Sequence, residues 1–196
     1  LLAMVDASVG GKTGINFNGL KNEIGVFSPA EYVLLDTEFL KTLDTRNLLS
    51  GYAEMLKHGI ISTESHWAEL LKFDINHIDY EELKRLVAQS VQIKEDIVEQ
   101  DPFEKGIRKA LNVGHTVGHA FESLALELNQ HVLHGYAVAW GIVCELYYSF
   151  LKVGFPKDKL RQTVQFIKEN YGVFTIDCKQ YDRLYEFMTH DKKNSA

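Results

Sequence analysis

Apolar side chains recur every three or four positions through most of the chain after residue 37, with polar side chains between them. This period places the apolar residues on one face of an α-helix and is typical of helices that pack on a shared core. Asp79 followed by Glu82, and Pro156, are residue choices typical of helix starts. We therefore expect a mainly α-helical chain, with helices at residues 45–61, 64–73, 80–100, 104–128, 135–152, 157–171 and 180–190.

The first 36 residues have a different pattern. Residues 1–5 and 32–35 are short apolar runs, partly β-branched, and we expect them to be strands. The glycine-rich stretch between them, residues 9–25, is expected to be a loop. No repeat, low-complexity tract or Pro-, Gly- or Ser-rich linker divides the chain. We predict a short α/β segment at residues 1–36 followed by one helical domain at residues 37–196.

Composition and charge exclude several classes of protein. With 196 residues, 45% of them apolar and 11% aromatic, the chain can bury a sizeable core. A net charge of -6 argues against broad affinity for nucleic acid or an anionic membrane, so neither is expected as a partner. The sequence has no run of 18 apolar residues and no signal-peptide pattern. We expect a cytoplasmic protein.

Residues 112–119, which read Asn-Val-Gly-His-Thr-Val-Gly-His, contain two histidines four positions apart. This spacing places His115 and His119 on one face of a helix, where two imidazoles can bind one metal ion. Gly114 and Gly118 each cost a helix about 1 kcal/mol relative to alanine, which suggests that something approaches the backbone closely there. A histidine pair with this spacing is also often a coincidence of the surface or core.

Two further residues give the histidine pair a context. Glu54 lies in an apolar run, where an unpaired carboxylate is costly to bury, and Lys57 one turn later shares its face. His134 stands at the start of an apolar helix, where its side chain can point inward. One glutamate and two histidines form a common ligand set for catalytic zinc. The spacing alone leaves open which two histidines take part.

The stretch Val-Gly-Gly-Lys-Thr-Gly at residues 9–14 follows an apolar run and resembles a phosphate-binding loop only superficially. A Walker A motif requires glycine where this chain has Asp6, whose charge would repel a triphosphate. No G-x-G-x-x-G dinucleotide fingerprint follows a strand either. The chain is therefore not expected to be a nucleotide hydrolase, and any complete nicotinamide-binding domain would lie outside it.

Four ordered motifs, at residues 2–16, 51–59, 111–119 and 133–135, closely resemble those of the 3-dehydroquinate synthase family, and the likeness extends over essentially the whole chain. The family converts 3-deoxy-arabino-heptulosonate 7-phosphate, a sugar acid phosphate, into 3-dehydroquinate and phosphate in the shikimate pathway, recycling NAD within each turnover. The resemblance implies the helical C-terminal domain of such an enzyme, preceded by the end of its NAD-binding domain. It also implies a homodimer, and inactivity for this portion alone.

The resemblance further implies a role for individual residues. Zn²⁺, or alternatively Co²⁺, would be bound by Glu54, His115 and His134, with His119 and Glu104 transferring protons. Substrate would be bound by Asp6, Lys12, Asn22, Lys57, Lys94, Arg108, Asn112 and either Lys192 or Lys193. NAD would be contacted by Lys21, Phe39, Leu40, Lys41 and Thr42.

Three other functions are alternatives. Another sugar-phosphate cyclase, of the inosose or valiolone synthase type, would use the same metal ligands on a different substrate. A metal-dependent glycerol-phosphate or alcohol dehydrogenase would release NADH instead of recycling it. A noncatalytic helical module stabilised by metal would have no turnover at all.

Overall fold

The computed structural model describes residues 1–17 and 20–189, and at residues 16 and 20–23 it describes the backbone only. The helices are α1 (Leu2–Val5), α2 (Thr45–Ile61), α3 (Glu64–Lys72), α4 (Tyr80–Gln100), α5 (His115–Glu127), α6 (His134–Val153), α7 (Lys157–Tyr171) and α8 (Tyr181–Thr189). The 3-10 helices are η1 (Thr37–Thr42), η2 (Ile107–Asn112) and η3 (Cys178–Gln180), and the strands are β1 (Lys12–Phe17) and β2 (Leu20–Phe27). The predicted mainly α-helical fold is confirmed. In this described part, no helix is long and apolar enough to cross a membrane.

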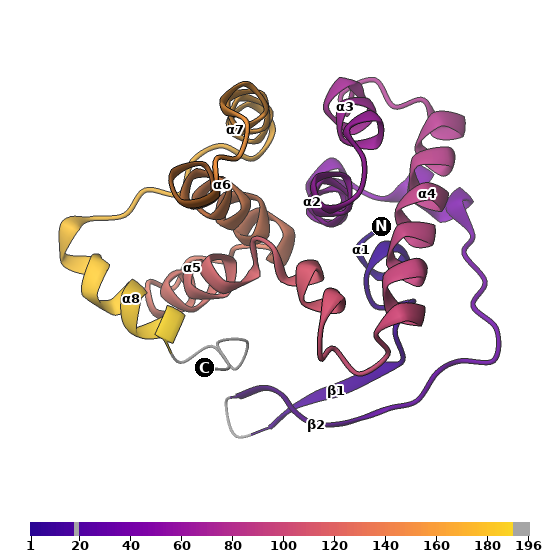
Figure 1. Ribbon diagram of the computed structural model, residues 1–196, viewed down its shortest axis with the longest axis horizontal. Coiled ribbons are helices and arrows are strands. Elements are labelled where there is room, and N and C mark those ends of the chain that lie inside the picture. Colours follow the sequence, from indigo (N-terminus) through magenta and orange to yellow (C-terminus); the bar gives the residue numbers. More distant parts are fainter. Residues whose placement is uncertain (18–19, 190–196) are drawn as a thin grey trace.

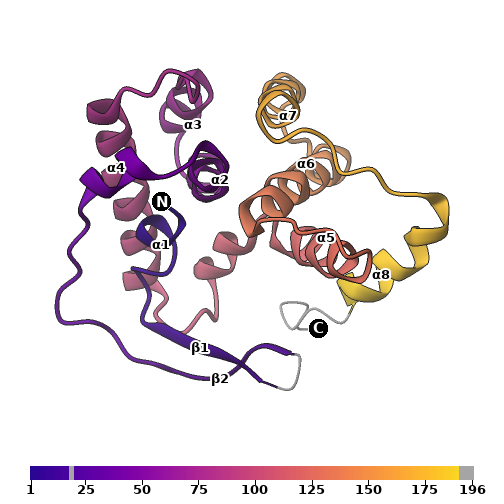
Figure 2. The ribbon, with the colours of Figure 1, turned by 180° about the vertical axis from the view of Figure 1, so that it is seen from behind.

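The helices form two groups (Figure 1). Helices α1 to α4 pack on one another, as do α5 to α8, and the view from behind shows the same division (Figure 2). The groups meet where α2 packs against α6, and the main apolar core joins Tyr52 and Met55 of α2 to Val138 and Ile142 of α6. The β1–β2 hairpin lies at the edge of the molecule opposite α3 and α7 (Figures 1 and 2).

Glycines allow α6 to approach its neighbours backbone to backbone. A Cβ atom on Gly135 would lie 1.8 Å from the carbonyl oxygen of Ser50 in α2, and one on Gly141 would lie 2.0 Å from that of Gly114. A Cβ atom on Gly118 would meet the α6 backbone at 3.1 Å. The close approach expected from Gly114 and Gly118 is confirmed, and α6 is what approaches. Helix α6 is therefore held against both α2 and α5.

Side-chain caps begin several helices, among them the predicted cap at Asp79. Asp44, Thr63 and Asp79 accept hydrogen bonds from main-chain N–H groups in the first turns of α2, α3 and α4. Such caps satisfy donors that the helix itself leaves unpaired. The ends of α2, α4 and α7 agree with the predicted ranges, those of α3 and α6 differ by a residue at one or both ends, and α8 begins one residue later than predicted. The predicted last residue of α8, His190, lies outside the described residues.

The predicted structure of the N-terminal segment is wrong in three places. Residues 1–5 are not a strand, because residues 2–5 form α1, which buries Val5 completely and packs on α2. Residues 32–35 form no strand in the described part of the chain, and Leu34 is 94% exposed. The expected loop at residues 9–25 instead contains β1 and most of β2, paired antiparallel. Runs of four or five apolar residues are too short for their spacing to distinguish a helix from a strand, so packing determines their structure.

The helix expected at residues 104–128 is interrupted. Residues 107–112 form η2, and α5 begins only at His115. The backbone of Glu104 has φ 58°, and that of Gly114 has φ 80°, a left-handed conformation that an α-helix cannot continue through. The interruption makes His115 the first residue of α5.

Candidate metal centre

Glu54 lies in the middle of α2, in a run where residues 48–59 are all buried. Its carboxylate is fully buried and forms an ion pair with Lys57, one turn later and equally inaccessible. Burial alone would raise the pKa of the Glu54 carboxyl, but Lys57 and His115 outweigh burial and hold the pKa well below its usual range. The site therefore contains a buried anion that stays ionised.

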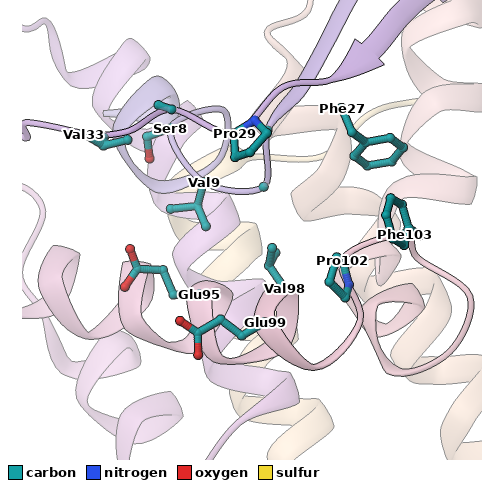
Figure 3. Close-up of a pocket in the computed structure, with 13 residues that line it drawn as sticks. Ser8, Val9, Phe27, Pro29, Val33, Glu95, Val98, Glu99, Pro102 and Phe103 are labelled. Carbon is teal, nitrogen blue, oxygen red and sulfur yellow. The ribbon is translucent and has the colours of Figure 1, made fainter.

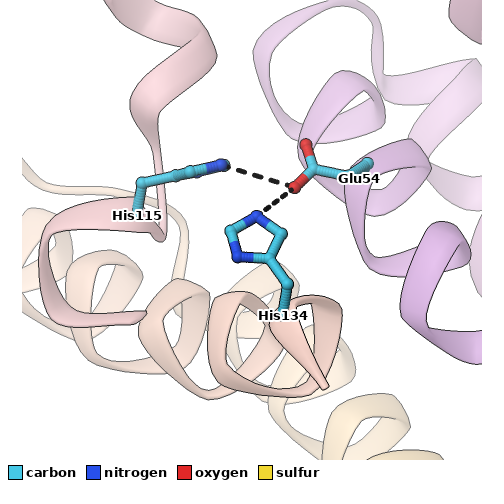
Figure 4. A group of neighbouring side chains, drawn as sticks. All are labelled: Glu54, His115 and His134. Carbon is cyan, nitrogen blue, oxygen red and sulfur yellow. Dashed lines mark ion pairs between the residues drawn. The ribbon is translucent and has the colours of Figure 1, made fainter. Parts of the chain in front are cut away.

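Two histidines face one oxygen of this carboxylate. The Nε2 atoms of His115 and His134 each lie 3.4 Å from Oε1 of Glu54 (Figure 4). This buried Oε1 atom has no hydrogen bond. Donors bound at 2.0–2.2 Å to one tetrahedral metal lie about 3.3–3.5 Å apart, which matches both separations. The three side chains therefore fit a divalent metal ion, and their nitrogen and carboxylate donors suit zinc or cobalt.

The outer nitrogens of both imidazole rings also have acceptors. Nδ1 of His115 lies 3.3 Å from the carbonyl oxygen of Val113, and Nδ1 of His134 lies 3.0 Å from Oε2 of Glu122. Burial would lower the pKa of His134, but its contacts with Glu122 and Glu54 outweigh burial and raise the pKa to about 9. Metal binding at His134 would therefore have to displace a proton.

His119 lies beside this group, one turn after His115 on α5. Its ring centroid is 5.5 Å from that of His115 and 5.9 Å from that of His134. The one-face arrangement expected from the spacing is confirmed. A second set of possible donors, His119, Glu122 and His134, shares His134 with the first. Its members are more exposed, and it lacks the buried oxygen that Glu54 supplies.

Two of the residues expected to bind substrate, Asp6 and Lys94, contact each other. Lys94 donates to the main-chain oxygen of Asp6 and, at 2.7 Å, to its Oδ1 atom. The charges of Glu54 and Lys57 affect the pKa values of both Asp6 and Lys94, so these four groups lie near one another. The α2 carboxylate thus belongs to a largely buried cluster of two cations and two anions.

A second cluster links the glycine-rich loop to the segment before α5. Glu104 forms an ion pair with Lys12 and accepts a 2.8 Å hydrogen bond from the side-chain amide of Asn112. Arg108 is buried and donates to the main-chain oxygens of Gly10 at 3.1 Å and Pro102 at 2.6 Å. The expected proton-transfer residue Glu104 is thereby connected to residues expected to bind substrate.

The glycine-rich loop also forms one wall of a pocket of about 500 Å³ (Figure 3). Apolar side chains of the loop, the end of β2 and the turn after α4 line it, among them Val9, Phe27 and Phe103, while Glu95 and Glu99 border it from α4. None of the three candidate metal ligands lines this pocket.

In the described part of the chain, no contact connects the residues expected to bind NAD with the candidate metal ligands. Phe39 is 72% exposed on η1, whereas Leu40 is buried in the main core. Lys41 pairs with Glu38 at 2.7 Å, and the Thr42 hydroxyl donates to the Phe39 carbonyl. The predictions for Lys192 and Lys193 lie outside the described residues, as do those for the side chains of Lys21 and Asn22.

Two carboxylates near the site, Glu122 and Glu145, were not among the residues predicted from the sequence. Glu122 contacts His134, and it could have been found, because it follows His115 by seven positions and His119 by three on the same helical face. Glu145 accepts hydrogen bonds from the main-chain N–H groups of Gly114 at 2.8 Å and Val117 at 3.4 Å. It caps the start of α5 from α6, and no spacing along the chain indicates this.

Comparison with solved structures shows the same fold in sugar-phosphate cyclases. A 2-deoxy-scyllo-inosose synthase complexed with carbaglucose-6-phosphate, NAD⁺ and Co²⁺ superposes with a TM-score of 0.82 at 22% identity, covering 98% of this chain and 54% of that one. The 2-epi-5-epi-valiolone synthase of Streptomyces hygroscopicus, with NAD⁺ and Zn²⁺ bound, gives a TM-score of 0.78 at 22% identity, covering 96% and 52%. At this identity, the likeness establishes the fold alone.

Sequence comparison is more specific. The 3-dehydroquinate synthase of Parabacteroides distasonis is 60% identical over the whole chain, which covers 56% of that protein, and that of Streptococcus pyogenes serotype M5 is 40% identical, with 54% covered. The chain thus spans about half the length of these curated relatives. The family model for the 3-dehydroquinate synthase C-terminal region matches residues 51–194, and the model for the N-terminal region matches residues 1–50. The chain belongs to the 3-dehydroquinate synthase family.

Proposed function

We propose that this chain forms the metal- and substrate-binding portion of a 3-dehydroquinate synthase. The proposed reaction converts 3-deoxy-arabino-heptulosonate 7-phosphate into 3-dehydroquinate and phosphate, by oxidation, phosphate elimination, reduction and ring closure. The observation that carries the proposal is the buried Oε1 atom of Glu54, placed 3.4 Å from two imidazole nitrogens in a chain 60% identical to a named 3-dehydroquinate synthase. The division into an NAD-binding end at residues 1–36 and a helical domain at residues 37–196 is part of the proposal.

Glu54, His115 and His134 are the proposed ligands of the metal ion. A divalent metal held there would supply Lewis acidity toward a substrate hydroxyl and the ketone that it becomes. Lys57 keeps Glu54 able to bind a metal ion, because it stabilises the ionised Glu54 carboxylate within the core. Zinc is the proposed ion, with cobalt as an alternative, and the two cyclases of the same fold are named with these ions.

The cations near the site are suited to an anionic substrate. Lys12 and Lys94 are each paired with a carboxylate, so a phosphate or carboxylate group entering the site would replace those contacts. The side-chain hydrogen bonds from Arg108 go to main-chain carbonyls, which carry no net charge, although its positive charge also interacts with the Asp101 carboxylate. Together with Lys57 and Asn112, these cations are proposed to hold the substrate's two acidic groups.

His119 and Glu104 are the proposed proton carriers. His119 lies next to both metal-binding imidazoles, and an imidazole is suited to proton transfer near neutral pH. Glu104 is only partly exposed and contacts Lys12 and Asn112, both proposed to bind substrate. Each could exchange a proton with a substrate hydroxyl held between them.

NAD is the proposed hydride carrier, in keeping with the NAD⁺ named in both cyclase structures. The proposed contacts from this chain are Lys21 and the segment from Phe39 to Thr42. Because relatives are nearly twice as long, the full activity is proposed for a protein of family length, acting as a homodimer, and not for these residues alone.

Phosphate release from 3-deoxy-arabino-heptulosonate 7-phosphate by the full-length protein tests this proposal. With catalytic NAD, we expect release that a chelator abolishes and zinc restores, without accumulation of NADH. His115→Ala should abolish release, whereas Glu127→Ala, which removes a carboxylate from the exposed face of the same helix, should not. Release of NADH would instead identify a dehydrogenase, and turnover of a different sugar phosphate alone would identify another cyclase.

A further inference from the structure

The two candidate histidine ligands share one arrangement. In both rings Nε2 lies 3.4 Å from Oε1 of Glu54, and in both Nδ1 lies near an oxygen acceptor. For His115 the acceptor is the main-chain carbonyl of Val113, two residues earlier. For His134 it is the carboxylate of Glu122, which comes from another helix. The two rings thus have the same orientation toward Glu54, although their Nδ1 atoms have different kinds of acceptor.

We propose that Glu122 is a positioning residue that fixes the ring orientation and tautomer of His134 for metal binding. An ionised carboxylate only accepts hydrogen bonds, so the 3.0 Å contact requires the proton on Nδ1 of His134. In the neutral ring, Nε2 then carries the lone pair, and this atom faces Glu54. Carboxylates in this relation to a metal-binding histidine orient the ring and increase its basicity.

The location of His134 explains why it needs such a partner. It is the first residue of α6, and its side chain is 25% exposed, whereas that of His115 is 8% exposed. Packing therefore restrains His134 less than it restrains His115. Glu122 is 14% exposed and lies on α5, so its contact also connects the two helices that supply the histidines.

This inference rests on the proposed metal set, and metal affinity in the full-length protein tests both. Zinc affinity would be measured by competition with a chromogenic chelator, and the geometry by the visible absorption of the Co²⁺-loaded protein. We expect Glu122→Ala to weaken zinc binding about 10- to 100-fold and to change the cobalt spectrum. Glu122→Gln should restore most of the affinity, because its amide oxygen can still accept from Nδ1.

A matched control and a reference variant separate the outcomes. Glu127→Ala removes the same charge from the same helix, but its partner is Arg183, and it should leave both measurements unchanged. Zinc affinity within twofold of wild type in Glu122→Ala would overturn the positioning role, provided that His115→Ala loses binding. Equal losses in Glu122→Gln and Glu122→Ala would identify Glu122 as a ligand itself and likewise overturn it. Unchanged binding in His115→Ala would overturn the metal set and the inference together.

Discussion

The two sides of the metal centre are built in different ways. On one side, Glu54 is fully buried in the middle of α2 and is held by the surrounding core and by Lys57. On the other side, His115 and His134 are the first residues of α5 and α6, and hydrogen bonds at these helix starts orient them. Changes on the α2 side should therefore affect stability and metal binding together. Changes on the histidine side should affect metal binding more than stability.

The same contrast appears in the acid–base behaviour of two histidines. His58 lies on α2, one turn after Glu54, and burial together with Lys57 lowers its pKa to about 3, although Glu54 opposes this shift. His134 is also largely buried, yet its contacts with Glu122 and Glu54 raise its pKa to about 9. The core on the α2 side excludes charge from an imidazole, whereas the carboxylates at the start of α6 favour it.

The largest effect is expected from Glu54→Gln. This change leaves the Lys57 ammonium buried without its carboxylate partner, a situation that typically costs about 3–5 kcal/mol. Urea denaturation of the metal-free protein would measure the loss, and chelator competition should show that zinc binding is lost as well. The double variant Glu54→Gln/Lys57→Met should regain most of the stability but not the zinc binding. Wild-type stability in Glu54→Gln would contradict the role given to charge pairing on the α2 side.

Gly135→Ala should separate the two sides of the centre. The added Cβ would lie 1.8 Å from the Ser50 carbonyl oxygen, so α6 would have to move away from α2. We expect a loss of stability of about 1–3 kcal/mol and weaker zinc binding, because His134 is adjacent to the displaced residue. Gly154→Ala, at the other end of α6, has open space and only backbone strain to accommodate. Zinc binding that falls equally in both variants would contradict this explanation.

Acidification should destabilise the α2 side through His58. Because its folded-state pKa of about 3 is below the unfolded value of 6.5, only the unfolded state takes up a proton as pH falls between these values. Stability is thus retained above pH 6.5 and lost progressively below it, by about 2 kcal/mol between pH 6.5 and 4.5. The charges of Lys57, Glu54, Lys94 and Asp6 all contribute to the pKa of His58.

Denaturation of the metal-free protein at both pH values would measure this loss. His58→Gln should remove that share of the pH dependence, whereas His131→Gln, at an exposed position, should not. An unchanged pH dependence in His58→Gln would show that other groups determine the acid sensitivity.

The sequence predicted what depends on long periodic patterns and missed what depends on contacts between segments. The ranges of α2, α4 and α7 follow from their apolar spacing. The apolar run at residues 1–5 was too short to distinguish α1 from a strand, and packing against α2 determines its structure. For the centre, spacing alone supplied Glu54 and candidate histidines, while the choice of His115 and His134 came from the family resemblance. The structure brings all three together, and their individual roles stay predictions.

Glu145 illustrates a contribution that no pattern along the chain could indicate. Its carboxylate comes from α6, yet it accepts from the main-chain N–H groups of Gly114 and Val117 at the start of α5. A glycine at the N-cap position has no side chain to provide this cap, and a negative charge there also favours the helix dipole.

The smallest effect is therefore expected from Glu145→Ala, which should lower stability by about 1 kcal/mol. It should also weaken zinc binding by a few fold, because His115 is the first residue of the helix that loses its cap. The stability and zinc affinity of Glu145→Gln should lie between those of Glu145→Ala and wild type, since glutamine keeps a hydrogen-bond acceptor but not the charge. Glu169→Ala, which removes a carboxylate from the exposed face of α7, controls for the change in net charge. The contrary outcome is a Glu145→Ala protein that loses stability yet binds zinc as tightly as wild type. That result would mean that His115 is held in place without the cap. The histidine side of the centre would then depend on packing more than its hydrogen bonds indicate.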